Sequence, residues 1–197
     1  AHAYSEHAPA ITLIPMFRRA IRYAQKSLAI RQQLGDLWGQ GQSLHYYGIV
    51  LYAASKFDDS VDRCREAIRL LQRMGDYWQV HIARYQIAAS LYHLGDLRGA
   101  LEEAQLNHRS GLETGDELAS GIILDVWARA TGGTLPEDIL LHELKRERHD
   151  AQGTAQVLLA EGIRLLGAGH ALEAANVFER AIAAAFSAAT PPSFSSP

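Results

Sequence analysis

The chain has little cysteine, no large excess of either charge and no long apolar run, and each deficit excludes a class of protein. Cys64 is the single cysteine in 197 residues, so no intrachain disulfide can form. No apolar stretch reaches the roughly eighteen residues that a membrane-spanning helix needs, and residues 11–16 are too short and badly flanked for a signal peptide. A formal net charge of -3 gives no reason to expect nucleic-acid binding. We therefore expect a cytoplasmic protein with neither a nucleic-acid nor a membrane partner.

What the chain does contain is a Gly-Asp pair that returns every forty residues, as Gly35-Asp36, Gly75-Asp76 and Gly115-Asp116. Glycine after a helix supplies the left-handed backbone of a helix C-terminus, and the following aspartate can cap the next helix. Gln79 lies three residues after Asp76, so its side chain is expected to reach back and complete a capping box. A regular period of this size indicates stacked copies of one small unit.

Apolar residues between these markers follow a helical spacing, as in Ile82, Tyr85, Ala88 and Leu91 before the turn at Gly95. One period therefore reads as a helix, a short turn and a second helix. No segment shows the strict alternation of a β-strand. The sequence predicts an all-α protein.

Small residues recur at fixed places in these periods, where two helices must approach closely. In this pattern the sequence resembles the tetratricopeptide repeat (TPR) family, in the forty-residue variety found in Leu-Gly-Asn-type adaptors and in bacterial signalling and regulatory proteins. The positions that match the family's small and apolar slots are Gly48, Ser60, Cys64 and Ala67, then Ala88, Ala100, Ala104 and Asn107, and finally Gly162, Ala174, Phe178 and Ala181.

The resemblance implies a right-handed solenoid of stacked antiparallel helix pairs with about four to five repeats. The expected repeats lie near 17–36, 37–75, 77–115, 117–150 and 151–186, with residues 1–16 read as part of a truncated first repeat and 187–197 as a disordered tail rich in proline and serine. The fourth repeat is irregular. A loop over 131–136 replaces its normal turn, Leu140 and Leu144 replace small residues, and a polar helix is expected over 137–150. We expect a bend or a special contact there.

In the family, the first helices of successive repeats line a concave groove. Carried over to this sequence, the resemblance places the following side chains in that groove: Gln42, His45, Ile49, Tyr52, Ile82, Tyr85, Ala89, Tyr92, His93, Asp125 and Arg129, with Gln156, Leu159 and Ile163 from the last repeat. Aromatic and histidine side chains combine apolar area with a polar tip, which suits a peptide or a partner domain. The alternative is that the tyrosines pack between neighbouring repeats. For Trp38 and Trp78, packing between repeats is the favoured interpretation.

No residue pattern indicates catalysis, a metal site or a cofactor. The segment from His142 to His149 lacks the second histidine of a zinc-protease helix, because position 146 is arginine, and it is interpreted as a solvated charged face. Gly132-Gly133 lacks the lysine of a phosphate loop and reads as a connection between helices. Cys64 reads as a small core hydrophobe.

The helix expected from residue 17 carries Arg18, Arg19 and Arg22 with no nearby acid. This basic face could meet an acidic partner or a phosphate; a solvated face, or one covered by a preceding repeat, is the alternative.

The leading functional hypothesis is a non-catalytic module that binds a peptide or partner domain within a larger signalling or regulatory protein. The alternative is a small-molecule-sensing domain of a bacterial transcription activator or kinase. A homodimer through an open end of the solenoid is a further alternative, because such an end exposes apolar surface unless a polar helix covers it.

Overall fold

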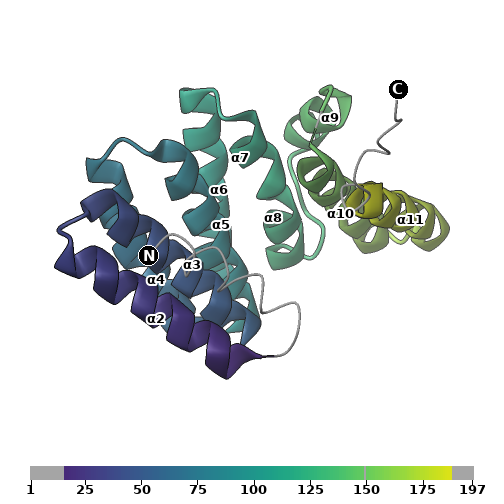
Figure 1. The fold of residues 1–197 in the computed structure, drawn as a ribbon. Coiled ribbons are helices and arrows are strands. Elements are labelled where there is room, and N and C mark those ends of the chain that lie inside the picture. Colours follow the sequence, from purple (N-terminus) through teal and green to yellow (C-terminus); the bar gives the residue numbers. More distant parts are fainter. Residues whose placement is uncertain (1–15, 149, 188–197) are drawn as a thin grey trace, which may run out of the picture.

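The computed structural model describes residues 16–148 and 150–187, and these residues form helices and turns without a strand. The prediction of an all-α protein is confirmed. Helices follow one another in chain order across the molecule (Figure 1), with α2 and α11 at opposite ends. They are α2 Phe17–Gln33, α3 Leu37–Ala53, α4 Phe57–Arg73, α5 Tyr77–His93, α6 Leu97–Thr114, α7 Glu117–Ile122, α8 Leu124–Ala130, α9 Glu137–Lys145, α10 Ala151–Gly167 and α11 Ala171–Ser187. The predictions for residues 1–15 and 188–197 lie outside the described part of the chain.

From α2 to α7 a helix begins every twenty residues, so one forty-residue period holds two helices of nearly equal length. The turns between them contain only two or three residues. Gly35, Gly75 and Gly115 have φ angles of 65°, 73° and 70°, which is the left-handed conformation predicted for them. A two-helix unit per period therefore follows from the turn residues.

The aspartates of these turns cap the helices that follow them, as predicted. The carboxylates of Asp36, Asp76 and Asp116 accept hydrogen bonds from the backbone N–H three residues later, at 2.8, 3.1 and 3.1 Å. The predicted capping box at Gln79 is wrong in its second half. Gln79 Oε1 lies 2.7 Å from His45 Nδ1 on α3 instead, because the buried histidine ring needs a hydrogen-bond partner.

Neighbouring helices from α2 to α6 pack in sequence order through small residues. A β-carbon at Gly48 would lie 2.3 Å from Cys64 Sγ, and one at Gly162 would lie 2.2 Å from the Phe178 ring. Both glycines therefore allow a close helix crossing that any larger residue would prevent. Cys64 is fully buried there, and burial raises the pKa of its thiol to about 12, so it behaves as a small hydrophobe.

The fourth repeat breaks this order. Ile123 separates the short helices α7 and α8, and α10 packs against both of them. The prediction of a helix over 137–150 is wrong at its end, because α9 stops at Lys145 and the backbone of Arg146 is extended, with φ -68° and ψ 131°. The Gly132-Gly133 connection packs on α10, where a β-carbon at Gly133 would lie 2.9 Å from the Ile163 carbonyl oxygen.

One continuous core of buried residues runs from α3 to α10. It includes Leu44, Ile87, Leu124, Leu140 and Val157. A smaller group joins α2 to α3 through Ala20, Ala24 and Val50. None of the described helices is both long enough and apolar enough to cross a membrane.

Candidate interaction site

Side chains from α3, α5, α8 and α10 meet in one cluster, although these helices lie far apart in the sequence. We call it the tyrosine cluster, and its members are Tyr52, Tyr85, Tyr92, His93, Asp125, Arg129 and Gln156. The sequence predicted every one of these residues as groove-facing. The contacts between them show that α3, α5, α8 and α10 hold these side chains close together.

The aromatic side of the cluster is formed by the C-terminal ends of α3 and α5. Tyr52 Oη and His93 Nε2 lie 3.0 Å apart, and Phe57 from α4 stacks on the His93 ring with centroids 4.9 Å apart. Phe57 was missed by the sequence analysis because it is the first residue of a second helix, whereas the groove slots of the family lie on first helices. Tyr52 and Tyr92 are half-buried and His93 is exposed, so this side faces solvent.

The charged side of the cluster comes from one turn of α8. Asp125 and Arg129 form an ion pair four residues apart, and the Arg129 guanidinium lies 5.4 Å from the centre of the Tyr92 ring. Asp125 is 1% exposed, and this burial raises the pKa of its carboxyl to about 6 in spite of the neighbouring arginine. The pair holds Arg129 against the tyrosines while its side chain stays 26% exposed.

Tyr85 links the two ends of the cluster. Gln156 Nε2 on α10 donates a hydrogen bond of 2.9 Å to the Tyr85 hydroxyl, across 71 residues of sequence. Burial and the nearby Asp125 carboxylate raise the pKa of Tyr85, so the hydroxyl stays neutral. Asp125 lies beside this hydroxyl and accepts a hydrogen bond from it. Gln156 Oε1 is a second acceptor there, and it is buried without a hydrogen-bond donor among the described residues.

Other predicted groove residues lie below the surface. Gln42, His45 and Ala89 are 8%, 2% and 3% exposed, so a ligand on the surface does not reach them. His45 fills the space between α3 and α5, and burial lowers its pKa to about 4, which keeps the ring neutral at pH 7. These three predicted groove residues therefore belong to the buried interior. Ile49 and Ile82 are half-buried on the helices that carry the cluster.

The turn aspartates also tie successive helix pairs together. Asp76 caps α5 with Oδ1, and its Oδ2 accepts a 2.7 Å hydrogen bond from Trp38 Nε1 on α3. Asp116 repeats the arrangement, with Oδ2 2.8 Å from Nδ1 of the fully buried His81. Trp38 thus links α3 to the turn before α5 through its indole N–H, while its side chain is 40% exposed. Trp78 is 52% exposed.

The charged segment that begins at His142 is only in part the solvated face that the sequence predicted, because His142, Lys145 and Glu147 are exposed but Glu143 is buried. Glu143 is 1% exposed and pairs with Arg146 and Arg148, while Ser120 on α7 donates a 3.0 Å hydrogen bond to its carboxylate. These contacts tie α9 and the following segment to α7, which explains why the chain leaves the helical path at Arg146. Sequence spacing alone could not show that Glu143 points inward. Within the described residues, no three potential metal ligands gather in one place.

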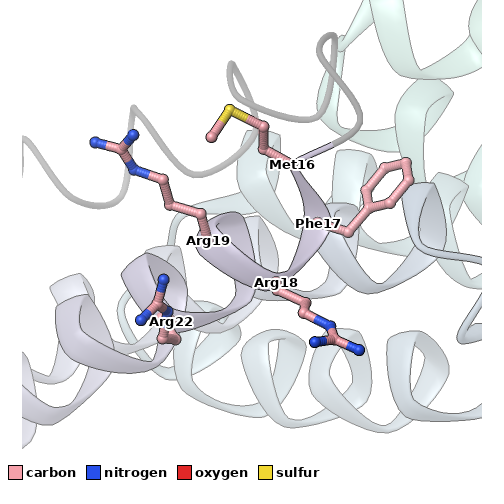
Figure 2. Close-up of a pocket in the computed structure, with 5 residues that line it drawn as sticks. All are labelled: Met16, Phe17, Arg18, Arg19 and Arg22. Atoms are coloured by element: carbon pink, nitrogen blue, oxygen red, sulfur yellow. The ribbon is translucent and has the colours of Figure 1, made fainter.

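The basic start of α2 is a weaker candidate. Arg18, Arg19 and Arg22 line a cavity of about 660 Å³ together with Met16 and Phe17. Figure 2 shows the three guanidinium groups pointing in different directions rather than toward a common point. Arg19 donates to the Tyr23 hydroxyl at 2.8 Å. Three diverging arginines do not form a site for a single anion.

The tyrosine cluster is thus the best-formed candidate site in the described part of the chain. It offers stacking surfaces, hydroxyl and imidazole groups, and one partly exposed guanidinium. These groups are suited to holding a ligand by stacking and hydrogen bonding. No protein-family model matches this sequence, and no curated protein matches it.

Proposed function

We propose that this chain is a TPR-like array that binds a peptide or a partner domain along the face formed by α3, α5, α8 and α10. The proposed array is a right-handed solenoid of four to five helix pairs, and it acts without catalysis within a larger signalling or regulatory protein. The single observation behind this proposal is the tyrosine cluster. It joins alternate helices, which are the first helices of the proposed repeats.

The composition of the cluster supports a peptide ligand. Tyr52 and Tyr92 present half-buried rings, and Arg129 adds a planar cation that is already held in place by Asp125. Rings and a pre-positioned guanidinium lose little conformational entropy on binding, which makes them effective contacts.

A crosslinking experiment tests the site directly. A photoreactive phenylalanine analogue at Tyr92 should capture a partner protein in cells that express the chain, and mass spectrometry should identify it. The matched control is the same analogue at Tyr77, which is the first residue of the same helix and is 51% exposed. A site-specific interaction gives a crosslink from position 92 and none from position 77.

The captured partner then allows a quantitative test with purified proteins. The Tyr52→Ala, Tyr92→Ala double variant should weaken its binding by at least about a hundredfold, since aromatic anchors commonly contribute about 2 kcal/mol each or more. Tyr77→Ala should bind as the unchanged protein does. Equal affinity for the double variant and the unchanged protein, with circular dichroism and melting unaltered, would reject the proposed site.

A regulatory small-molecule sensor is the second candidate. It is favoured by the acceptor pair at Asp125 and Gln156, which could hold a small donor such as an amine or amide beside Tyr85. A ligand that prefers the folded state raises the melting temperature. A metabolite library should therefore contain a compound that stabilises the protein but not the Asp125→Asn variant. The sensor hypothesis fails if the protein captured from position 92 binds but no compound raises the melting temperature.

A further inference from the structure

A pocket with charged walls lies apart from the tyrosine cluster, between α9, α10 and α11 (Figure 1). Three arginines border it: Arg146 and Arg148 from the segment that follows α9, and Arg180 from α11. We call it the arginine pocket. Its volume is about 180 Å³, which is about six times the ~30 Å³ that one water molecule takes up in the liquid. Sites for drug-sized ligands are larger, at roughly 300–1,000 Å³, so this pocket has room for a small group only.

Arg146 and Arg148 meet at one carboxylate oxygen. Arg146 Nη1 lies 3.4 Å from Glu143 Oε2, and Arg148 pairs with the same oxygen atom. The two guanidinium groups are therefore close neighbours, unlike the diverging arginines at the start of α2 (Figure 2). The Glu143 side chain is fully buried, and its other oxygen accepts the hydrogen bond from Ser120. Glu143 thus holds both arginines in place without presenting its carboxylate to solvent.

Contacts with α7 fix the positions of these two arginines. The Arg148 side chain is 7% exposed, and it packs so closely on α7 that a β-carbon at Gly121 would collide with its guanidinium group. The Arg146 side chain is 18% exposed and donates a 3.1 Å hydrogen bond to the Ser120 hydroxyl. Cations that are already in position lose little conformational entropy when a ligand binds.

The arginine pocket contains more positive than negative charge. Arginine stays protonated in proteins, so three guanidinium groups stand against one carboxylate, that of Glu143, among the described residues that line the pocket. The difference is two positive charges. Leu144, Val157 and Leu158 form apolar parts of the wall, and charges interact more strongly beside such surfaces than in water. A ligand with two negative charges would balance this excess.

We propose that the arginine pocket binds a dianionic phosphate group, either as free phosphate or as the phosphate of a small organic ester. The planar guanidinium group of arginine can donate two parallel N–H groups to phosphate oxygens. Thr154 also lines the pocket, but its hydroxyl donates to the Asp150 carbonyl oxygen at 2.8 Å. The arginines therefore recognise the ligand.

A carboxylate is the alternative anion, and it fits the pocket less well. It carries one negative charge, so it would leave one of the two excess positive charges uncompensated. It also offers two acceptor oxygens to three guanidinium groups, whereas a phosphate ester offers three. We therefore expect the pocket to discriminate against acetate.

Calorimetry and thermal unfolding of the full chain with inorganic phosphate test the proposal. At about pH 8 a phosphate group carries close to two negative charges, because this pH lies above its second pKa. Phosphate should raise the melting temperature as its concentration increases, whereas chloride and acetate at the same ionic strength should not. Calorimetry should show one phosphate site per chain, with acetate bound at least about tenfold more weakly.

Arg180→Gln should weaken phosphate binding by about tenfold or more, because it removes one group that makes charge-assisted hydrogen bonds. The variant should fold normally, since Arg180 is exposed; circular dichroism and melting in chloride check this. Arg65→Gln is the matched control. It removes the same charge from an exposed position on α4, which packs on α3 and α5. It should bind phosphate as the unchanged protein does.

Four results would each overturn the proposal: a melting temperature no higher in phosphate than in chloride, acetate that binds as tightly as phosphate, unchanged affinity in Arg180→Gln, or an equal loss in Arg65→Gln. Methyl phosphate distinguishes the two sources of the ligand. Binding at least as tight as that of inorganic phosphate supports an ester, and weaker binding supports the free ion. None of these results bears on partner binding at the tyrosine cluster, because Tyr52 and Tyr92 are not among the residues that line the arginine pocket.

Discussion

The regular helices α3 to α6 and the irregular segment α7 to α9 hold their neighbours in different ways. In the regular part, each helix packs on the next through small residues such as Gly48, and the turn aspartates add a cap and a link. In the irregular part, α10 packs on α7 and α8, Glu143 forms ion pairs with Arg146 and Arg148, and Ser120 of α7 donates a hydrogen bond to Glu143. Close contacts persist there, as at Gly133, and buried charge is added to them.

The two parts contribute different groups to the tyrosine cluster. The regular helices supply Tyr52, Tyr85, Tyr92 and His93, and α8 of the irregular part supplies the Asp125–Arg129 pair. The ion pair of the cluster therefore comes from the part of the chain that departs from the repeat pattern. The regular helices supply the aromatic surface, and the irregular part adds a buried ion pair to it.

The largest expected effect tests the ion pairs of the irregular part. Glu143→Ala removes the buried carboxylate to which Arg146 and Arg148 are paired, which should lower the free energy of unfolding by about 3–5 kcal/mol. Urea denaturation followed by circular dichroism measures it. Glu102→Ala is the control in the regular part, where the pair with Arg98 is exposed to solvent and its loss should change stability little. Similar losses for both variants would contradict the difference drawn between the two parts.

The pH dependence should have opposite signs in the two parts. Burial lowers the pKa of His45 to about 4, so its contribution to stability is complete above its unfolded pKa of 6.5 and is lost as the pH falls toward 4. Burial raises the pKa of Asp125 from 3.8 to about 6, so its contribution is complete below pH 3.8 and is lost as the pH rises through 6. Each titration changes the free energy of unfolding by about 3 kcal/mol.

Urea denaturation at several pH values between 4 and 7 should separate these two groups. Relative to the unchanged protein, His45→Gln should gain stability as the pH falls, and Asp125→Asn should gain stability as the pH rises. The changes with pH are compared rather than the absolute values, because each substitution also alters local contacts. Curves that stay parallel to that of the unchanged protein would show that these two residues do not titrate as their burial requires.

A smaller effect tests the double role of the turn aspartates at the boundary between the two parts. Asp116→Ala removes the cap of α7 and the partner of the buried His81, and should cost about 2–3 kcal/mol. Asp96→Ala removes the cap of α6 in an exposed turn and should cost about 1 kcal/mol. Thermal unfolding of both variants provides the measurement. If they lose the same stability, the link from Asp116 to His81 contributes nothing.

The smallest effect compares a glycine from each part. Gly75→Ala strains the backbone at φ 73° without any atom near the new methyl group, and should cost about 1 kcal/mol. Gly133→Ala adds a contact of 2.9 Å with the Ile163 carbonyl oxygen, so it should cost about 1 kcal/mol more. Thermal unfolding of both variants measures the two losses of stability. Equal losses would mean that the loop at Gly133 shifts to make room for the methyl group, and that it does not pack tightly on α10.

Sequence reasoning succeeded where the cause was local. The Gly-Asp turns predicted helices that begin after Asp36, Asp76 and Asp116, and the structure begins helices there. Helical periodicity predicted the fold class, and the small slots predicted the close crossing at Gly48. The members of the tyrosine cluster were all predicted as well, because helix periodicity and the resemblance to the TPR family placed them on one side of alternate helices.

It failed where a distant residue decided the outcome. Gln79 turned away from its cap because His45, on another helix, is buried beside it. Glu143 was expected in solvent and is buried by α7 and two arginines that follow it. Phe57 was overlooked because it begins a second helix, and its contact with His93 lies at the far end of the helix that follows. In each case the decisive partner lies outside the local window of sequence.

What the sequence by itself determined is the succession of helices and turns, because caps and left-handed glycines act within a few residues. Only the tertiary structure decided which of the predicted groove residues stay accessible, since burial depends on helices that arrive later in the chain. His45 is covered by α5, whereas Leu159 is half-buried and borders a cavity between α10 and α11. Two residues predicted for the same groove thus differ in burial, because different helices pack on them.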